Sequence, residues 1–250
     1  NTTGQRNAVL GYNAAANLTT GSYNTVMGRQ AAVDLTTGNY NTFIGSYCGD
    51  EQIAGSNNTA LGYAAYQHNA GKLNVAIGNG AMSNGGGSAD SPYANTAVGA
   101  TSLKSLQNGA TGNIGLGLQA LPGCTTGDYN IGIGYKSGEN LTTGSYNIAI
   151  GRENDFSAAS ATGQIAIGRG VATTENYQVA IGYTNGVIRN EFDTDATWTQ
   201  SSDLRKKKNI NDMNLGLEFI DKLRPITYQW KPNNELPEQF DEYAEENTKD

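Results

Sequence analysis

Charged residues are scarce over most of this 250-residue chain. Residues 203–250 hold 8 of the 16 Lys and Arg and 11 of the 23 Asp and Glu, which leaves the first 202 residues almost uncharged. A net charge of −7 without an extended basic face argues against binding to nucleic acid. No apolar run approaches the ~20 residues that a membrane-spanning helix needs, so we expect no membrane insertion.

Side chains that bind metals or react covalently are also few. His68 is the only histidine, and no Cys or second His lies near it in the sequence, so the sequence predicts neither a metal site nor a cofactor. Cys48 and Cys124 occupy different phases of the repeat described next. We therefore predict that both are small buried residues rather than disulfide partners.

Glycine is abundant instead, and eleven of the 33 glycines close a five-residue repeat. The repeat reads Asn-Thr-Val-Met-Gly at 24–28 and Asn-Thr-Phe-Ile-Gly at 41–45. Its second and fourth places are mostly branched or long apolar residues and its third is usually small, which is the period-two pattern of a β-strand. The closing residues, mostly 17 apart, are Gly11, Gly28, Gly45, Gly62, Gly78, Gly99, Gly117, Gly134, Gly151, Gly168 and Gly182. The repeat predicts a β-solenoid of about eleven 17-residue rungs.

Two further features fit a solenoid. Many copies pass through Leu-Thr-Thr-Gly-X-Tyr, as at 18–23 and 141–146, where Gly permits the positive φ of a turn. Asn fills nine of the eleven first places and is expected to form a side-chain ladder. Gln164 and Gln178 fill the last two first places, and we expect them to extend that amide ladder.

Such a coil must be thin. Seventeen residues at ~3.3 Å each give a perimeter of roughly 56 Å before turns are subtracted. With 8% aromatic residues, one chain buries little apolar surface against its ordering entropy. We therefore expect a homo-oligomer whose chains pack their apolar strand faces together around one axis.

The pattern Asn-Thr-Ala-Ile-Gly-X-X-Ala over residues 7–185 resembles the head repeats of YadA-like trimeric adhesins and similar repeats of viral fibre proteins. The resemblance implies a trimeric β-roll.

The stretch Ser-Ser-Asp-Leu-Arg-Lys-Lys-Lys-Asn-Ile at 201–210 begins a different region. Asn211 and Asp212 can cap a helix from about 213 to 223, and the alternating residues 226–230 predict a short strand. The motif at 202–210, followed by Leu-Arg-Pro-Ile-Thr-Tyr-Gln-Trp at 223–230, resembles the start of the intramolecular chaperone domain of phage tail fibres and tailspikes, the endosialidase-type family. The expected fold is thus an all-β solenoid followed by a small α/β chaperone segment. The expected boundaries are 1–186 for the solenoid fibre domain, 187–202 for a connector and 203–250 for a partial chaperone domain.

The resemblance also implies chemistry. Members of the family are homotrimeric, guide the folding of the fibre and then cleave themselves from it. Carried over by position, the scissile bond is Ser202-Asp203, with Ser202 as nucleophile and Lys207 as base. A serine hydroxyl needs such a base, and nearby Arg205, Lys206 and Lys208 would lower the pKa of Lys207. The charge run by itself favours a solvated basic turn, and the surrounding family pattern favours the cleavage motif instead. At most, we expect single-turnover autoproteolysis.

These features favour a structural viral protein, the trimeric part of a tail fibre or tailspike that attaches to the host. Its expected partners are two further copies, other virion tail proteins and a host-surface receptor such as a glycan. Its expected location is the virion, after synthesis in the host cytoplasm. Two alternatives stay open. One is a bacterial trimeric surface adhesin, although no coiled-coil heptads follow the repeat. The other is a glycan-depolymerising tailspike, which needs a pair of carboxylates; Asp50 with Glu51 and Glu153 with Asp155 are the close pairs in the repeat region.

Overall fold

The computed structural model describes residues 3–51, 54–68, 71–85, 92–107, 109–192 and 199–200. The chain divides into two units, residues 1–202 and 203–250, and every described residue belongs to the first. Within the described residues all regular structure is β-strand, with no helix. The helix and strand expected at 213–223 and 226–230 lie outside the described residues.

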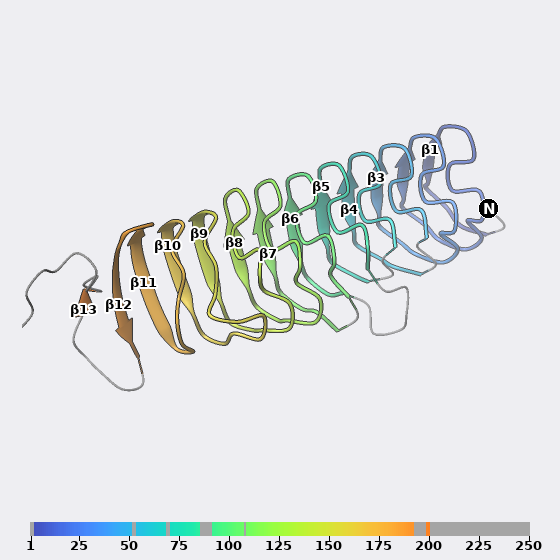
Figure 1. The fold of residues 1–250 in the computed structure, drawn as a ribbon. Helices are drawn as coiled ribbons and strands as arrows, with labels where there is room; N and C mark the ends of the chain where they lie inside the picture. Colours follow the sequence, from blue (N-terminus) through green and yellow to red (C-terminus); the bar gives the residue numbers. More distant parts are fainter. Residues whose placement is uncertain are drawn as a thin grey trace, which may run out of the picture. The chain divides into compact units, whose positions relative to one another are not determined.

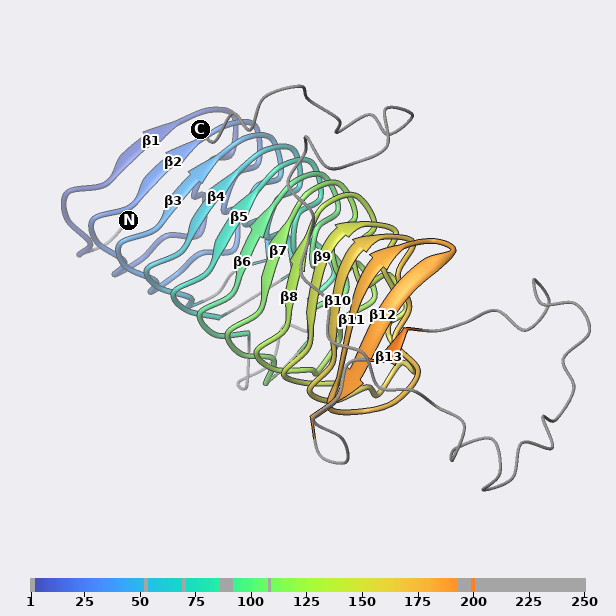
Figure 2. The same cartoon turned by 90° about the vertical axis from the view of Figure 1, so that its left-hand side faces the viewer.

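Eleven strands run parallel and pair in sequence order, so the predicted all-β solenoid is confirmed (Figure 1). They are β1 (Ala8–Leu10), β2 (Thr25–Met27), β3 (Thr42–Ile44), β4 (Thr59–Leu61), β5 (Val75–Ile77), β6 (Thr96–Val98), β7 (Ile114–Leu116), β8 (Ile131–Ile133), β9 (Ile148–Arg152), β10 (Ile165–Arg169) and β11 (Gln178–Tyr183). Figure 2 shows these strands side by side along one face of the coils. The next strand, β12 (Gly186–Glu191), reverses direction and pairs antiparallel with β11, and β13 (Thr199–Gln200) pairs antiparallel with β12.

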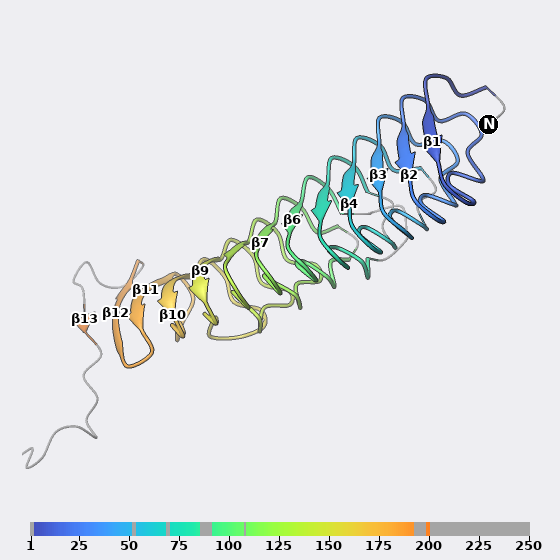
Figure 3. The ribbon, with the colours of Figure 1, turned by 90° about the horizontal axis from the view of Figure 1, so that it is seen from above.

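Each position of the five-residue repeat pairs with the same position of the repeat in the next coil. Thr25 lies opposite Thr42, and Ile148 lies opposite Ile165. The longer interval between β5 and β6 leaves this register intact, because Ala76 still pairs with Ala97. Viewed from above, the strands keep their sequence order along the solenoid (Figure 3). Insertions are therefore absorbed in the connections and not in the strands.

The closing glycines are required both by conformation and by space. Their φ angles lie between 121° and 158°, a region that residues with a Cβ rarely adopt. A Cβ added at Gly134 would also collide with the carbonyl oxygen of Gly151 in the next coil. The neighbouring backbones can approach to sheet spacing at this corner only because both carry glycine.

The interior of each coil is one layer of side chains thick. The third place of each strand points inward, and Val26, Phe43 and Ala149 are buried there. Where the inward residue is large, the facing segment is small: a Cβ added at Gly49 would lie 2.9 Å from the Phe43 ring. The opposite arrangement also occurs, since a Cβ at Gly132 would lie 2.6 Å from Leu121 Cγ. The core thus has no room for two large side chains at one level.

Buried asparagines at the first places form the predicted ladder. Asn113 is completely buried, and its Nδ2 donates hydrogen bonds to Asn95 Oδ1 (3.0 Å) and to the Gly127 carbonyl (2.8 Å). Its Oδ1 accepts hydrogen bonds from the backbone N–H (2.9 Å) and the Nδ2 (3.0 Å) of Asn130. The same pattern repeats through Asn147. Each amide is fully hydrogen-bonded, so its burial carries no unpaired polar group.

The expected extension of this ladder by glutamine is wrong. The Gln164 backbone N–H still donates to Asn147 Oδ1 (3.0 Å), but its longer side chain turns away and donates to Asn176 Oδ1 (3.0 Å). Gln178 Nε2 donates to Thr174 Oγ1 (3.1 Å). The extra methylene carries the glutamine amide past the stacking position, so the amide-to-amide series ends at Asn147.

Replacement of Asn113 by alanine tests the ladder. Asn113→Ala removes the amide partners of the buried Gly127 carbonyl and of the Asn130 backbone N–H, at about 1–3 kcal/mol for each group, while Asn130 Nδ2 keeps its hydrogen bond to the Gly144 carbonyl. We expect the free energy of unfolding, measured by urea denaturation, to fall by at least about 2 kcal/mol. Asn79→Ala, at an exposed place, should change it by less than about 0.5 kcal/mol. Equal small effects would show that the ladder contributes little.

Candidate functional site

The second and fourth places of the strands lie on the side opposite the buried third place, and we call this surface the outer face; Val179, in the last parallel strand, is buried there. The second-place residues are Ala8, Thr25, Thr42, Thr59, Val75, Thr96, Ile114, Ile131, Ile148, Ile165 and Val179. The fourth-place residues are Leu10, Met27, Ile44, Leu61, Ile77, Val98, Leu116, Ile133, Ile150, Ile167 and Ile181. Every fourth place is aliphatic, and many remain open: Met27 is 44% exposed and Leu61 45%.

Such a surface is unusual on an isolated chain. Eleven strands at ~4.8 Å give an apolar stripe about 50 Å long. Exposed apolar patches of this size mark interaction sites more often than ordinary surface. Neither column of the outer face carries a charge. The outer face is therefore the candidate functional site of the described residues.

Tyrosines border one edge of the outer face. The residue before each first place has a positive φ in every coil, and it is Tyr23, Tyr40, Tyr129, Tyr146 or Tyr177 in five of them. The Tyr23 and Tyr40 rings stack with centroids 4.8 Å apart. The left-handed conformation costs roughly 1–2 kcal/mol for a residue with a Cβ, and ring stacking between coils offsets part of it.

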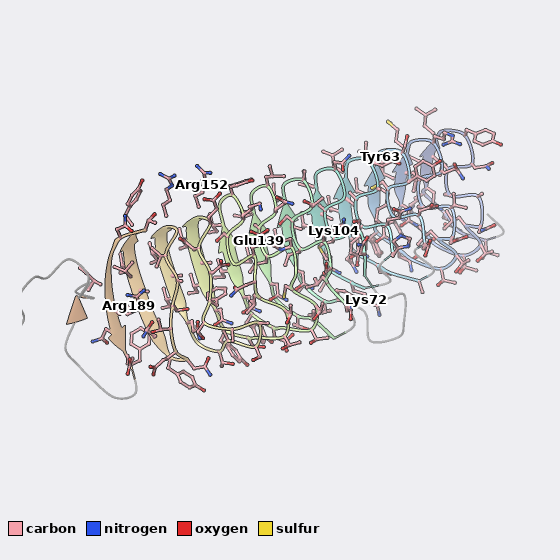
Figure 4. All side chains as sticks on the ribbon, in the orientation of Figure 1. Tyr63, Lys72, Lys104, Glu139, Arg152 and Arg189 are labelled. Carbon is pink, nitrogen blue, oxygen red and sulfur yellow. The ribbon has the colours of Figure 1, made fainter. Side chains whose placement is uncertain are left out.

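The opposite edge follows the closing glycines and carries tyrosine and arginine. The Arg152 guanidinium lies 5.6 Å from the Tyr135 ring centroid, and Arg169 Nη1 donates a hydrogen bond to the Tyr183 hydroxyl (2.6 Å). Figure 4 shows Tyr63 and Arg152 along this edge and Lys72 along the other. The aliphatic stripe is thus bounded by amphipathic side chains on both sides.

These two borders were not predicted from the sequence. Their signal was present, since Tyr recurs directly before the first-place Asn and Tyr or Arg recurs directly after the closing Gly.

The carboxylates considered for glycan cleavage have other partners. Glu153 pairs with Arg152 (3.0 Å) on the exposed surface. Asp155 accepts a hydrogen bond from the Asn140 N–H (3.3 Å), and burial raises the pKa of its carboxyl. Glu51 pairs with His68 Nδ1 (2.7 Å), while burial and the neighbouring Asp34 and Glu51 raise the pKa of Asp50. These contacts assign the carboxylates a structural role at the surface of the turns.

Both cysteines are free and buried, as predicted. Burial raises the pKa of the Cys48 and Cys124 thiols to about 12, so neither is a thiolate at neutral pH. The described part of the chain contains no group of three or more His, Cys, Asp or Glu placed to hold a metal ion. The same residues include no helix long and apolar enough to cross a membrane.

Ser202, Asp203 and Lys207, the predicted cleavage site, lie outside the described residues.

Comparison with known proteins finds a match for the segment that follows the solenoid. Residues 202–247 match the family model described as "Chaperone of endosialidase". This match begins at Ser202, the first residue of the motif singled out in the sequence. Together with the β-solenoid it fits the tail-fibre and tailspike type that the sequence resembles. Searches of curated proteins and of solved structures returned no match.

The carboxyl of Asp50 supplies a pH-dependent prediction. Its pKa is raised in the folded chain, so its contribution to stability is fully present below the ordinary value of 3.8 and is lost as the pH rises through the folded pKa. We expect Asp50→Asn to raise the thermal midpoint at pH 7 and to leave it nearly unchanged at pH 3. Glu175→Gln, at an exposed residue, should leave both midpoints unchanged. A lower midpoint for Asp50→Asn at pH 7 would show that the charged form stabilises the fold.

Proposed function

We propose that this chain is part of a phage tail fibre or tailspike that attaches to the host, and that three copies assemble through their outer faces. The observation that supports assembly most strongly is the outer face itself, with an aliphatic residue in the fourth place of all eleven coils. A surface with the same residue type at every coil can pack against another copy of itself along its whole length, because both copies repeat at the same ~4.8 Å spacing.

Three copies suit the shape of this surface. The outer face is only two columns wide, and in a cyclic arrangement the second-place column of one chain meets the fourth-place column of the next. Both columns are then covered without a free apolar edge. The resemblance to YadA-like heads and to the chaperone family implies the same number.

The thin interior of each coil is a physical reason for several chains to assemble. Each coil encloses one layer of side chains, much of it alanine, so a single chain buries little apolar surface. Packing the outer faces together adds a second core, shared by the chains, along the whole solenoid. Parallel pairing over a long chain is also slow to form, which suits a fibre that carries its own folding aid.

The segment that matches the chaperone family would guide this assembly and then separate. In this proposal Lys207 takes the hydroxyl proton of Ser202, and the Ser202 oxygen attacks the carbonyl carbon of the Ser202-Asp203 bond. The C–N bond breaks, the Asp203 nitrogen leaves with the proton that Lys207 held, and water hydrolyses the ester that has formed. Water supplies the new carboxyl oxygen on Ser202, and Asp203 becomes a free amino terminus. The solenoid would remain on the virion and contact a receptor, such as a surface glycan.

The oligomeric state tests the assembly. We expect the full chain carrying Ser202→Ala to sediment at three times the mass of one 26.3 kDa chain. Sedimentation equilibrium over a range of concentrations measures this mass. A monomer at all concentrations would refute outer-face assembly, and a stable dimer would refute the three-fold arrangement.

Denaturing electrophoresis tests the cleavage separately. The unmodified chain should yield fragments of residues 1–202 and 203–250, whereas Ser202→Ala should remain at full length. Ser201→Ala is the matched control and should still be cleaved. Single full-length bands from the unmodified chain and Ser202→Ala alike would contradict self-cleavage.

A further inference from the structure

The outer face is not uniform along the solenoid. In the second-place column, Thr occupies β2, β3, β4 and β6, whereas Ile occupies β7 to β10 and Val occupies β11. The fourth-place column is aliphatic throughout. The half from β7 to β11 is therefore aliphatic in both columns, and the half from β1 to β6 is mixed.

The threonine hydroxyls face outward. Thr25 and Thr59 are exposed, and Thr42 and Thr96 are half-buried. Thr and Ile are both branched at Cβ, so they suit a strand equally well. They differ when another surface covers them, because a hydroxyl then loses water and needs a new hydrogen bond, whereas the Ile side chain does not.

The inward third place does not follow this division. It is alanine in β4, β5 and β6 and again in β9, β10 and β11, where all six residues are fully buried, while β1 to β3 carry Val9, Val26 and Phe43 and β7 and β8 carry glycine. The asparagine ladder runs from the first half into the second as far as Asn147. The change from threonine to isoleucine at β7 is thus a property of the outward second place.

Strand length changes within the second half. Strands β1 to β8 have three residues each, whereas β9 and β10 have five and β11 has six. The extension brings Arg152 and Arg169 onto the outward side of the sheet, paired in register two residues beyond the last aliphatic place. The last three coils therefore present a wider sheet, in which two arginines lie beside the aliphatic columns.

We infer that chains associate first through the half from β7 to β11, and that the half from β1 to β6 closes onto its partners afterwards. The occupant of this surface is a further copy of this chain, so the inference rests on the proposed homo-oligomer. In this order of events the aliphatic half forms the nucleus of assembly. The threonine-bearing half adds stability once the chains are held in register, when its hydroxyls can find partners at fixed positions.

Chemically identical substitutions in the two halves test this order. Ile133→Thr with Ile150→Thr alters two fourth places in the second half, and Ile44→Thr with Ile77→Thr alters two in the first half. All four residues lie on the outer face, so each monomer should keep its fold, as checked by circular dichroism. Association is followed by light scattering after dilution from urea, and dissociation by subunit exchange between labelled copies.

A residue in an assembly nucleus changes the rate of association, and one that packs later changes mainly the rate of dissociation. We expect the Ile133/Ile150 pair to slow association by about tenfold or more. The Ile44/Ile77 pair should leave the association rate nearly unchanged and speed dissociation. The reciprocal change, Thr42→Ile with Thr59→Ile, makes β3 and β4 aliphatic in both columns like the second half. It should speed association by adding a second nucleus, and it remains informative if a threonine variant fails to fold.

Equal slowing of association by the two threonine pairs, or greater slowing by the Ile44/Ile77 pair, would overturn the order while leaving the homo-oligomer intact. An unmodified chain that stays monomeric would instead overturn the proposed assembly itself. An oligomer that is insensitive to both pairs would show that its interface lies elsewhere, and both proposals would fail.

Discussion

The spacing between coils is the constraint on which the rest of the structure depends. Backbones must approach to about 4.8 Å at every point of the circuit, including the corners, for the parallel strands to pair. At the corner after each strand only glycine permits this approach, as the carbonyl of Gly151 beneath Gly134 shows. At the corner before each strand the asparagine amide donates hydrogen bonds to, and accepts them from, the neighbouring coils, as at Asn113. Because glycine recurs in all eleven coils and asparagine in nine of them, an error in register at one coil would misplace both sets of contacts at once.

The constraint also explains where the large side chains lie. A coil with so short a perimeter has room for a small third-place residue on most strands, and the larger buried side chains, such as Leu35 and Leu121, come from the connections. The second- and fourth-place residues lie on the opposite side of the strand, where a single chain leaves many of them exposed. Apolar side chains therefore lie on both faces of the same sheet.

Much of the fold could be predicted from the sequence, because the same five-residue pattern occurs eleven times. The strand positions, the asparagine series and the buried free cysteines all follow from period and residue type. The tyrosine edge could not be predicted in the same way, since Tyr23 has little preference for the left-handed conformation and adopts it only because the coils on either side require it. The expected role of Gln164 was wrong for a related reason: chemical similarity to asparagine did not supply the side-chain length that stacking requires. The arrangement of Ser202 and Lys207 is a matter of tertiary structure beyond the repeat, where no periodic rule applies.

The antiparallel turn from β11 to β12 determines where further coils can be added to the solenoid. The outer hydrogen-bonding edge of β11 is occupied by a strand of opposite direction, so another coil in the parallel series cannot be added there. Within the series each coil contacts only its neighbours and repeats the same register, so a whole 17-residue unit could be gained or lost without altering the hairpin. Fibres of different reach could thus arise by duplication or deletion of interior units, while the junction with the segment after residue 202 stays the same.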